Sequence, residues 1–177
     1  MDSSYETILD EADIDRILTR ITHKILEVHR GAENLTLMGV QTRGVYLAKR
    51  LQAKIKEIEG IEIPTGDMDI TLYRDDWTRI SHHPVVQATD ILFSVDGKQI
   101  ILVDDVLYTG RTTRAAMDAV MDFGRPDRIE LAVLVDRGHR ELPIQADYVG
   151  KIVETRRSEK INVLLTEHDG EDKVVIG

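Results

Sequence analysis

Two adjacent aspartates, Asp104 and Asp105, stand between an apolar run and a short segment that is rich in hydroxyl groups. Residues 100–103 are all apolar, and such a run is typical of a strand buried on both faces, as in a parallel sheet. Residues 109–113 contain three threonines, one glycine and one arginine. A loop of this kind that leads into a helix offers backbone N–H groups and hydroxyl donors to a phosphate. The two carboxylates would repel a phosphate, so we expect them to face another part of the ligand, such as hydroxyl groups or a magnesium ion.

Apolar residues after this loop repeat at helical spacing, and Gly124 and Pro126 end the predicted helix. The sequence therefore predicts a strand, an acidic pair, a hydroxyl-rich loop and a helix. In open α/β sheets, ligands bind outside the carboxyl ends of the strands, where this loop would lie. The alternative interpretation is that Asp104 and Asp105 only end the strand and cap a turn. The Walker A pattern and the dinucleotide-binding glycine pattern are both absent from the sequence.

A second strand, turn and helix are predicted from residues 35–40, 41–44 and 45–58, with Gly60 at the end of the helix. Arg43 in the turn can bind phosphate oxygens through two parallel hydrogen bonds. Gly44 allows the backbone to approach a ligand closely. The alternative, a surface arginine at the start of a helix, is disfavoured because a cation there opposes the helix dipole.

The remaining patterns predict one further helix and several strands. The helix spans residues 13–30, and the strands span residues 69–73, 91–94, 128–135, 148–153 and 161–165, with a hairpin turn at 96–97. Residues 74–84 form a long polar loop that includes two adjacent histidines, for which we expect exposure to solvent rather than metal binding. The acidic tail after Thr166 shows no informative pattern. Three polar loops, at residues 42–44, 104–113 and 136–140, should meet at one edge of the sheet.

The composition limits the classes of protein to which the chain can belong. It has 177 residues, 42% of them hydrophobic, which suits one globular domain. The absence of cysteine excludes disulfides, thiolate zinc sites and cysteine nucleophiles. No apolar run approaches the ~20 residues that cross a bilayer, and the acidic N-terminus is unlike a signal peptide, so we expect a cytoplasmic protein. A formal net charge of −9 argues against a protein dominated by non-specific nucleic-acid binding.

Residues 100–112, IILVDDVLYTGRT, resemble the phosphoribosyl pyrophosphate (PRPP) signature of type I phosphoribosyltransferases. The chain more narrowly resembles the PyrR family, pyrimidine operon attenuators that are also uracil phosphoribosyltransferases. This narrower resemblance also rests on the strings DITLYRDD at 69–76, DRGHRELP at 136–143 and ADYVGK at 146–151. It covers nearly the whole chain, from about residue 8 to residue 165.

The resemblance implies an α/β protein with the type I phosphoribosyltransferase fold. This fold has a central, mostly parallel sheet flanked by helices, a small hood and a flexible flap loop. Residues 1–177 would form a single phosphoribosyltransferase domain, whose hood is built from the N-terminal segment and roughly residues 138–165. The flap would lie in the polar loop after residue 73. The resemblance also implies a homodimer or a higher oligomer.

The implied reaction is that of uracil with PRPP to give UMP and pyrophosphate. Asp104 and Asp105 would hold the ribose hydroxyls, directly or through water on Mg²⁺ that is bound with PRPP rather than by the protein alone. The other implied site residues are Tyr108, Thr109, Gly110, Arg111, Thr112 and Thr113 for the 5′-phosphate; Thr42, Arg43, Gly44, Arg74 and Arg79 for the pyrophosphate; and Arg137, Asn162 and Val163 for uracil. We assign no general base. The PRPP signature is common to the superfamily, so a phosphoribosyltransferase for another nucleobase, such as hypoxanthine, is an alternative.

The resemblance also implies an RNA partner, a hairpin in pyrimidine-operon mRNA. The other alternative is therefore an RNA-binding attenuator whose enzyme activity is secondary. The candidate RNA-binding residues combine cations with imidazoles and hydroxyls, and are Thr19, Arg20, His23, His139, Arg140 and Lys151. We expect Arg20, His23, Arg140 and Lys151 to share one face. Val28 and Gln145 stand where family members often carry arginine, which argues against RNA binding, as does the negative charge.

Overall fold

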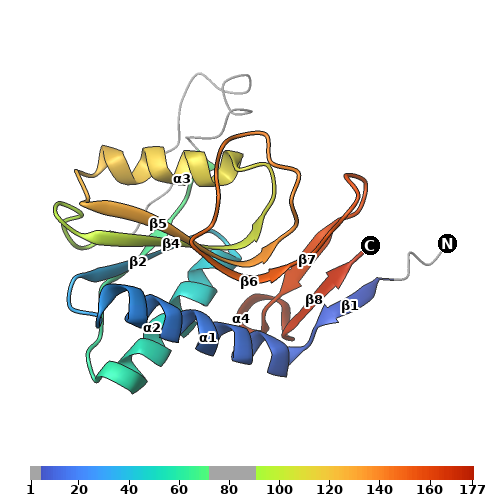
Figure 1. Ribbon diagram of the computed structural model, residues 1–177, viewed down its shortest axis with the longest axis horizontal. Coiled ribbons are helices and arrows are strands. Elements are labelled where there is room, and N and C mark those ends of the chain that lie inside the picture. Colours follow the sequence, from blue (N-terminus) through green and yellow to red (C-terminus); the bar gives the residue numbers. More distant parts are fainter. Residues whose placement is uncertain (1–4, 72–90) are drawn as a thin grey trace.

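A five-stranded parallel sheet runs through the middle of the protein in the order β3-β2-β4-β5-β6 (Figure 1). The computed structural model describes residues 5–71 and 91–177. The strands are β2 (Leu35–Val40), β3 (Thr65–Met68), β4 (Gln99–Leu107), β5 (Arg128–Asp136) and β6 (Tyr148–Ile152). All four neighbouring pairs are parallel, so the expected α/β architecture with a central parallel sheet is confirmed.

Helices cover both faces of this sheet. Helices α1 (Glu11–His29) and α2 (Arg43–Glu59) lie on one face, and α3 (Arg111–Asp122) lies on the other (Figure 1). The first helix begins with a capping box, in which Asp10 and Asp13 exchange side-chain-to-backbone hydrogen bonds. The second ends at Gly60, whose φ of 72° lies in the left-handed region that glycine adopts without strain.

The apolar run of β4 is buried because each of its two faces meets a different group of helices. Ile101 and Val103 belong to the cluster that packs under α1 and α2, whereas Ile100 and Leu102 belong to the cluster under α3. This alternation is that expected of successive residues in a strand. The central strand is therefore held from both sides, which gives a rigid support for the side chains at its carboxyl end.

A second, three-stranded antiparallel sheet lies beside the first, in the order β1-β8-β7 (Figure 1). Its strands are β1 (Glu6–Leu9), β7 (Ile161–Leu164) and β8 (Lys173–Ile176), and the short helix α4 (Thr166–Asp169) joins the last two. The small sheet thus combines the N-terminal segment with residues 161–164. It also includes strand β8 from the acidic tail, for which no structure was predicted.

Two expected strands are wrong. The strand expected at residues 69–73 lies earlier, as β3, because β2 ends at Val40 and pairs with β3 only up to Met68. Residues 91–94 form no strand; Ile91 and Phe93 instead pack against the cluster under α3. The turn at Asp96–Gly97 is confirmed, although it precedes β4 without forming a hairpin. The central strand also continues through the two aspartates to Leu107, rather than ending before them.

Candidate active site

The acidic pair lies near the carboxyl end of β4, with its backbone fixed by the pair's own side chains. The Asp104 carboxylate accepts a hydrogen bond from the Asp105 N–H at 2.8 Å, and the Asp105 carboxylate accepts one from the Val106 N–H at 2.8 Å. Asp104 is only 8% exposed. Burial, and then the negative charge of Asp105, raises the pKa of the Asp104 carboxyl well above its usual value. The pair is therefore a place where a cation, or a hydroxyl group that donates hydrogen bonds, would be stabilising.

The loop after β4 leads directly into the N-terminus of α3. Gly110 starts the helix with a φ of 92°, a left-handed conformation that an L-residue with a side chain rarely adopts. In the part of the chain that the structure describes, no side chain caps this helix at Gly110. The Thr109 hydroxyl accepts a hydrogen bond from the Arg111 N–H at 3.3 Å, and Thr113 is buried. Backbone N–H groups and hydroxyls thus gather at the positive end of a helix dipole, an arrangement that suits the phosphate expected here.

The turn before α2 lies against the acidic pair. The Gln41–Thr42 peptide is cis, and Arg43 and Gly44 begin the helix. A Cβ atom on Gly44 would overlap the Val103 carbonyl oxygen, so the close approach of this turn to β4 depends on glycine. The Arg43 guanidinium makes two hydrogen bonds to the Asp169 carboxylate, Nη2 to Oδ1 at 2.7 Å and Nε to Oδ2 at 3.0 Å.

Two cavities meet at this edge of the sheet, and Arg43 and Asp105 line both of them. The first has a volume of about 490 Å³ and is polar; its lining includes Thr42, Asp104 and Thr112. The second has a volume of about 530 Å³ and lies against the small sheet, where Asn162 and Val163 line it. The structure therefore brings the expected pyrophosphate loop, the acidic pair, part of the 5′-phosphate loop and two expected uracil residues to one place.

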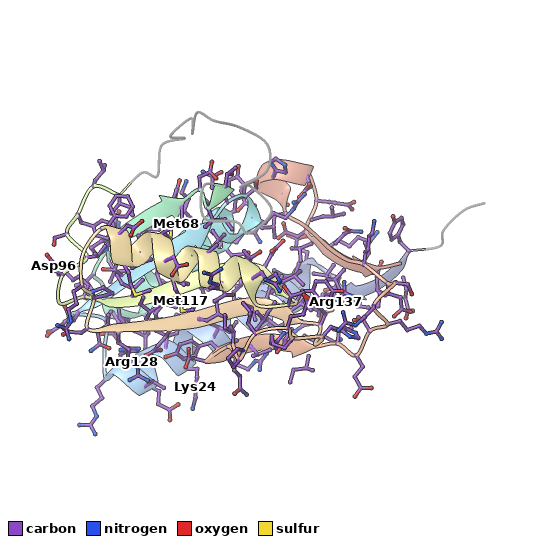
Figure 2. All side chains as sticks on the ribbon, turned by 90° about the horizontal axis from the view of Figure 1, so that it is seen from above. Lys24, Met68, Asp96, Met117, Arg128 and Arg137 are labelled. Carbon is purple, nitrogen blue, oxygen red and sulfur yellow. The ribbon has the colours of Figure 1, made fainter. Side chains whose placement is uncertain are left out.

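Arg137, the third residue expected to contact uracil, is placed differently. Its side chain is buried, its guanidinium carbon lies 4.0 Å from the centre of the Tyr108 ring, and its Nη2 donates to the Arg156 carbonyl at 3.0 Å. Neither of the two cavity linings includes it among the described residues. Figure 2 shows Arg137 near one end of α3 and Asp96, which lies in the turn before β4, near the other. In this arrangement Arg137 supports Tyr108, in the expected 5′-phosphate loop, by a cation–π contact.

The candidate RNA-binding residues fall into two groups. Arg20, His23 and Lys151 are exposed, and Arg20 donates to the Gly150 carbonyl, so α1 and β6 bring two of these cations together. Lys151 also donates to the Ile8 carbonyl at 3.3 Å.

His139 and Arg140 are turned toward the loops of the candidate active site, whereas Thr19 lies between α1 and α2 and belongs to neither group. Arg140 donates to the Tyr108 carbonyl at 2.7 Å and to Asp136 Oδ2 at 2.6 Å, and His139 Nε2 lies 2.6 Å from the Thr155 carbonyl oxygen. Thr19 is partly buried, and its hydroxyl bonds to the Asp15 carbonyl and to Lys54. The guanidinium of Arg140 therefore holds the backbone of the expected 5′-phosphate loop at Tyr108.

Sequence reasoning missed Asp169, which pairs with Arg43 from a position 126 residues away. It also missed Asp69 and Thr71, which line the first cavity, and Tyr5 and Lys173, which line the second. The short apolar run at residues 174–176 was the one available signal for the tail. Arg74, Arg79, the expected flap and the two adjacent histidines lie outside the described residues. Within residues 5–71 and 91–177, no three His, Asp or Glu residues gather in a way that would hold a metal ion, and no helix is long and apolar enough to cross a membrane.

Comparisons with known proteins identify the family and the fold of the chain. Residues 4–168 match the family described as the phosphoribosyl transferase domain. The chain is 60% identical over 169 residues to the Bifunctional protein PyrR of Pelotomaculum thermopropionicum, covering 96% of this chain and 93% of that protein. It is 61% identical over 170 residues to the Bifunctional protein PyrR of Desulfosudis oleivorans, covering 96% of this chain and 94% of that protein. The fold resembles that of a hypoxanthine-guanine phosphoribosyltransferase of Bacillus anthracis, with a TM-score of 0.72 at 16% identity over 98% of both chains, which confirms the expected fold.

Proposed function

Since the chain belongs to the PyrR family of phosphoribosyl transferase domain proteins, we propose that it transfers a phosphoribosyl group from PRPP to uracil, giving UMP and pyrophosphate. The observation that carries this proposal is the pair of adjoining cavities that share Arg43 and Asp105. PRPP needs separate places for its 5′-phosphate, its ribose and its pyrophosphate, and the base needs a fourth. The N-terminus of α3, the acidic pair, the turn at Arg43 and the cavity against the small sheet supply these four places.

The difficult step is the departure of pyrophosphate from C1′ of the ribose. As this bond breaks, positive charge develops on the ribose ring and negative charge on the leaving group. Asp104 and Asp105 place negative potential beside the ring, and Arg43 provides a cation for the leaving group. Groups that are fixed in advance where charge develops stabilise a transition state strongly, because they need little reorganisation. No covalent nucleophile on the protein is required.

Magnesium bound with PRPP belongs to this proposal. Carboxylate oxygens are ligands that Mg²⁺ prefers, and Asp104 and Asp105 offer them side by side. Asp104 and Asp105 line the same cavity, and a divalent cation there would offset both their mutual repulsion and the cost of a buried charge on Asp104, so the residues present fit the ion. Mg²⁺ would neutralise charge on the pyrophosphate, while the acidic pair itself orients the ribose.

Uracil is proposed for the cavity against the small sheet, where Asn162 and Val163 line the wall. The test is a panel of nucleobases, each assayed for PRPP-dependent release of pyrophosphate. We expect the rate with uracil to exceed the rates with hypoxanthine, guanine and cytosine. A faster rate with hypoxanthine would overturn the proposed base, and no release with any base would overturn the enzyme assignment.

Binding of a pyrimidine-operon mRNA hairpin is the second proposed function. The name of the relatives describes them as bifunctional. The exposed side chains of Arg20, His23 and Lys151 favour this function, because α1 and β6 place cations and an imidazole on neighbouring elements. The test is binding of the protein's own leader RNA, with an unrelated hairpin as the control and UMP present. Equal affinity for both RNAs would contradict the proposal.

A further inference from the structure

The Arg43 guanidinium has a carboxylate partner of its own within the chain. Two of its N–H groups, on Nη2 and Nε, donate to the two oxygens of Asp169 at 2.7 and 3.0 Å. The side chains of Arg43 and Asp169 are 29% and 15% exposed. The hydrogen bonds from Arg43 lower the pKa of Asp169, and the same contact raises the pKa of Arg43. Both groups are therefore charged at neutral pH, and the contact uses the paired donors with which arginine binds phosphate.

Asp169 is a fixed counter-ion rather than a mobile surface side chain. Its Oδ2 atom also accepts a hydrogen bond from the Leu165 N–H at 2.8 Å. The segment that carries it is fixed to α2 by Arg50, which makes two hydrogen bonds to Glu167, at 2.6 and 2.8 Å, and two to Asp172, at 2.6 and 2.8 Å. A carboxylate that is held in this way loses little conformational entropy when it pairs with Arg43.

The Arg43–Asp169 pair lies where the two halves of the site meet. Arg43 lines both cavities. Asp169 lies at the end of α4, and α4 directly follows β7, which carries the wall residues Asn162 and Val163. The pair therefore joins the expected pyrophosphate loop to the sheet that borders the expected base site.

We propose that Asp169 competes with the diphosphate group of the substrate and of the product for the Arg43 guanidinium. This inference rests on the proposed function, in which Arg43 binds pyrophosphate. A diphosphate that approaches Arg43 is repelled by Asp169 and needs the N–H groups that Asp169 occupies. It binds only to the fraction of molecules in which the pair has opened, so its apparent affinity is reduced by that fraction. UMP carries no diphosphate and is unaffected, so Asp169 sets the preference of the site between the two classes of ligand and favours release of pyrophosphate.

The test is the variant Asp169→Asn, with binding measured by calorimetry at a fixed, saturating Mg²⁺ concentration. An asparagine oxygen can still accept the Leu165 N–H, but the amide NH₂ faces an N–H group of Arg43 and cannot accept from it. We expect the Kd of pyrophosphate to fall about 3- to 10-fold, because one charge-assisted contact no longer opposes binding. The Kd of UMP should stay unchanged.

Glu167→Gln is the matched control. It removes one negative charge from the same segment, but Glu167 pairs with Arg50 and not with Arg43. We expect this variant to change the Kd of neither ligand. An equal gain in pyrophosphate affinity in Glu167→Gln would mean that general loss of charge, rather than the Arg43 contact, is responsible, and would overturn the proposal.

Arg43→Ala separates this inference from the proposed function. In an Arg43→Ala background, Asp169→Asn should have no further effect on pyrophosphate binding, because the contact is already gone. One outcome is that Arg43→Ala weakens the binding of pyrophosphate more than that of UMP, while Asp169→Asn does not strengthen the binding of pyrophosphate. In that case competition by Asp169 is wrong and the pyrophosphate site stands. If Arg43→Ala weakens both ligands equally, the assignment of Arg43 to pyrophosphate fails, and the competition fails with it.

Discussion

Replacing Asp172 by asparagine should destabilise the fold by an amount that depends on pH in a defined way. The Asp172 side chain is 8% exposed. Its carboxylate accepts hydrogen bonds from Nη1 and Nη2 of Arg50 and from the backbone N–H and the hydroxyl of Thr166. The bonds from Arg50 contribute most to lowering the pKa of Asp172 from 3.8 to about 2. One pKa unit corresponds to about 1.4 kcal/mol, and solvent screening of the partly exposed Arg50 lowers the total contribution to about 1–2 kcal/mol.

The sign follows from the lowered pKa. A carboxyl whose pKa is lower in the folded than in the unfolded protein contributes its full stability above the unfolded value, and that stability is lost as pH falls through the folded value. The stabilisation by Asp172 is therefore lost as pH falls from about 4 to about 2, and about half of it is left near pH 3.

The assay is urea unfolding of the wild type and of Asp172→Asn at several pH values from 7 to 3. We expect a difference in unfolding free energy of about 1–2 kcal/mol at pH 7 that narrows toward pH 3. Glu167→Gln is the control, because its carboxylate is 36% exposed and such pairs contribute about 0–1 kcal/mol. Equal stability of wild type and Asp172→Asn at pH 7, or a difference that does not change with pH, would refute the reasoning.

Three further predictions concern the contact of Gly44 with β4, the buried side chain of Tyr148 and the exposed side chain of Arg20. Gly44→Ala should lower the unfolding free energy by about 1–3 kcal/mol, because the added methyl overlaps the Val103 carbonyl oxygen; unchanged denaturant midpoints would contradict this. The pKa of Tyr148 is raised by burial and by the hydrogen bond to Glu130, so its phenol should ionise at higher pH than the phenols of exposed tyrosines. In an absorbance titration, Tyr148→Phe should therefore lose only the part of the signal that changes at the highest pH, and loss of signal at lower pH would contradict this. Arg20→Ala should weaken the binding of leader RNA and reduce the slope of log affinity against log salt concentration by about one, while the rate of uracil phosphoribosyl transfer stays near normal. An unchanged slope would count against RNA binding by the exposed cations of α1 and β6.

The strand–loop–helix units of the site could be predicted from the sequence because each depends on local pattern. The apolar run before Asp104 is long enough to indicate a strand buried on both faces, and the helix after Gly110 has regular spacing. The strand β3 could not be found in this way, since its sequence Thr-Gly-Asp-Met contains residues that are rare in strands and is stabilised by pairing with β2.

The role of the tail could not be predicted, because it depends on contacts between distant residues. Residues 166–172 contain four carboxylates, one glycine and one threonine, a composition typical of a solvated surface segment. Only the folded chain brings Asp169 to Arg43 and Asp172 to Arg50, 126 and 122 residues apart. The same limit applies to Arg140, whose contact with the Tyr108 carbonyl makes it a support of the proposed 5′-phosphate loop.

The most direct test of the central claim is the rate of UMP formation from uracil and PRPP in the wild type and in the double variant Asp104→Asn, Asp105→Asn. An asparagine oxygen can still accept the Asp105 and Val106 N–H groups that the two carboxylates accept now, so the variant should keep its fold, which circular dichroism and thermal unfolding would verify. We expect turnover in the wild type and a loss of at least about 10²-fold in the variant, as for the removal of other groups that stabilise transition-state charge. Wild-type rates in a folded double variant would contradict the account.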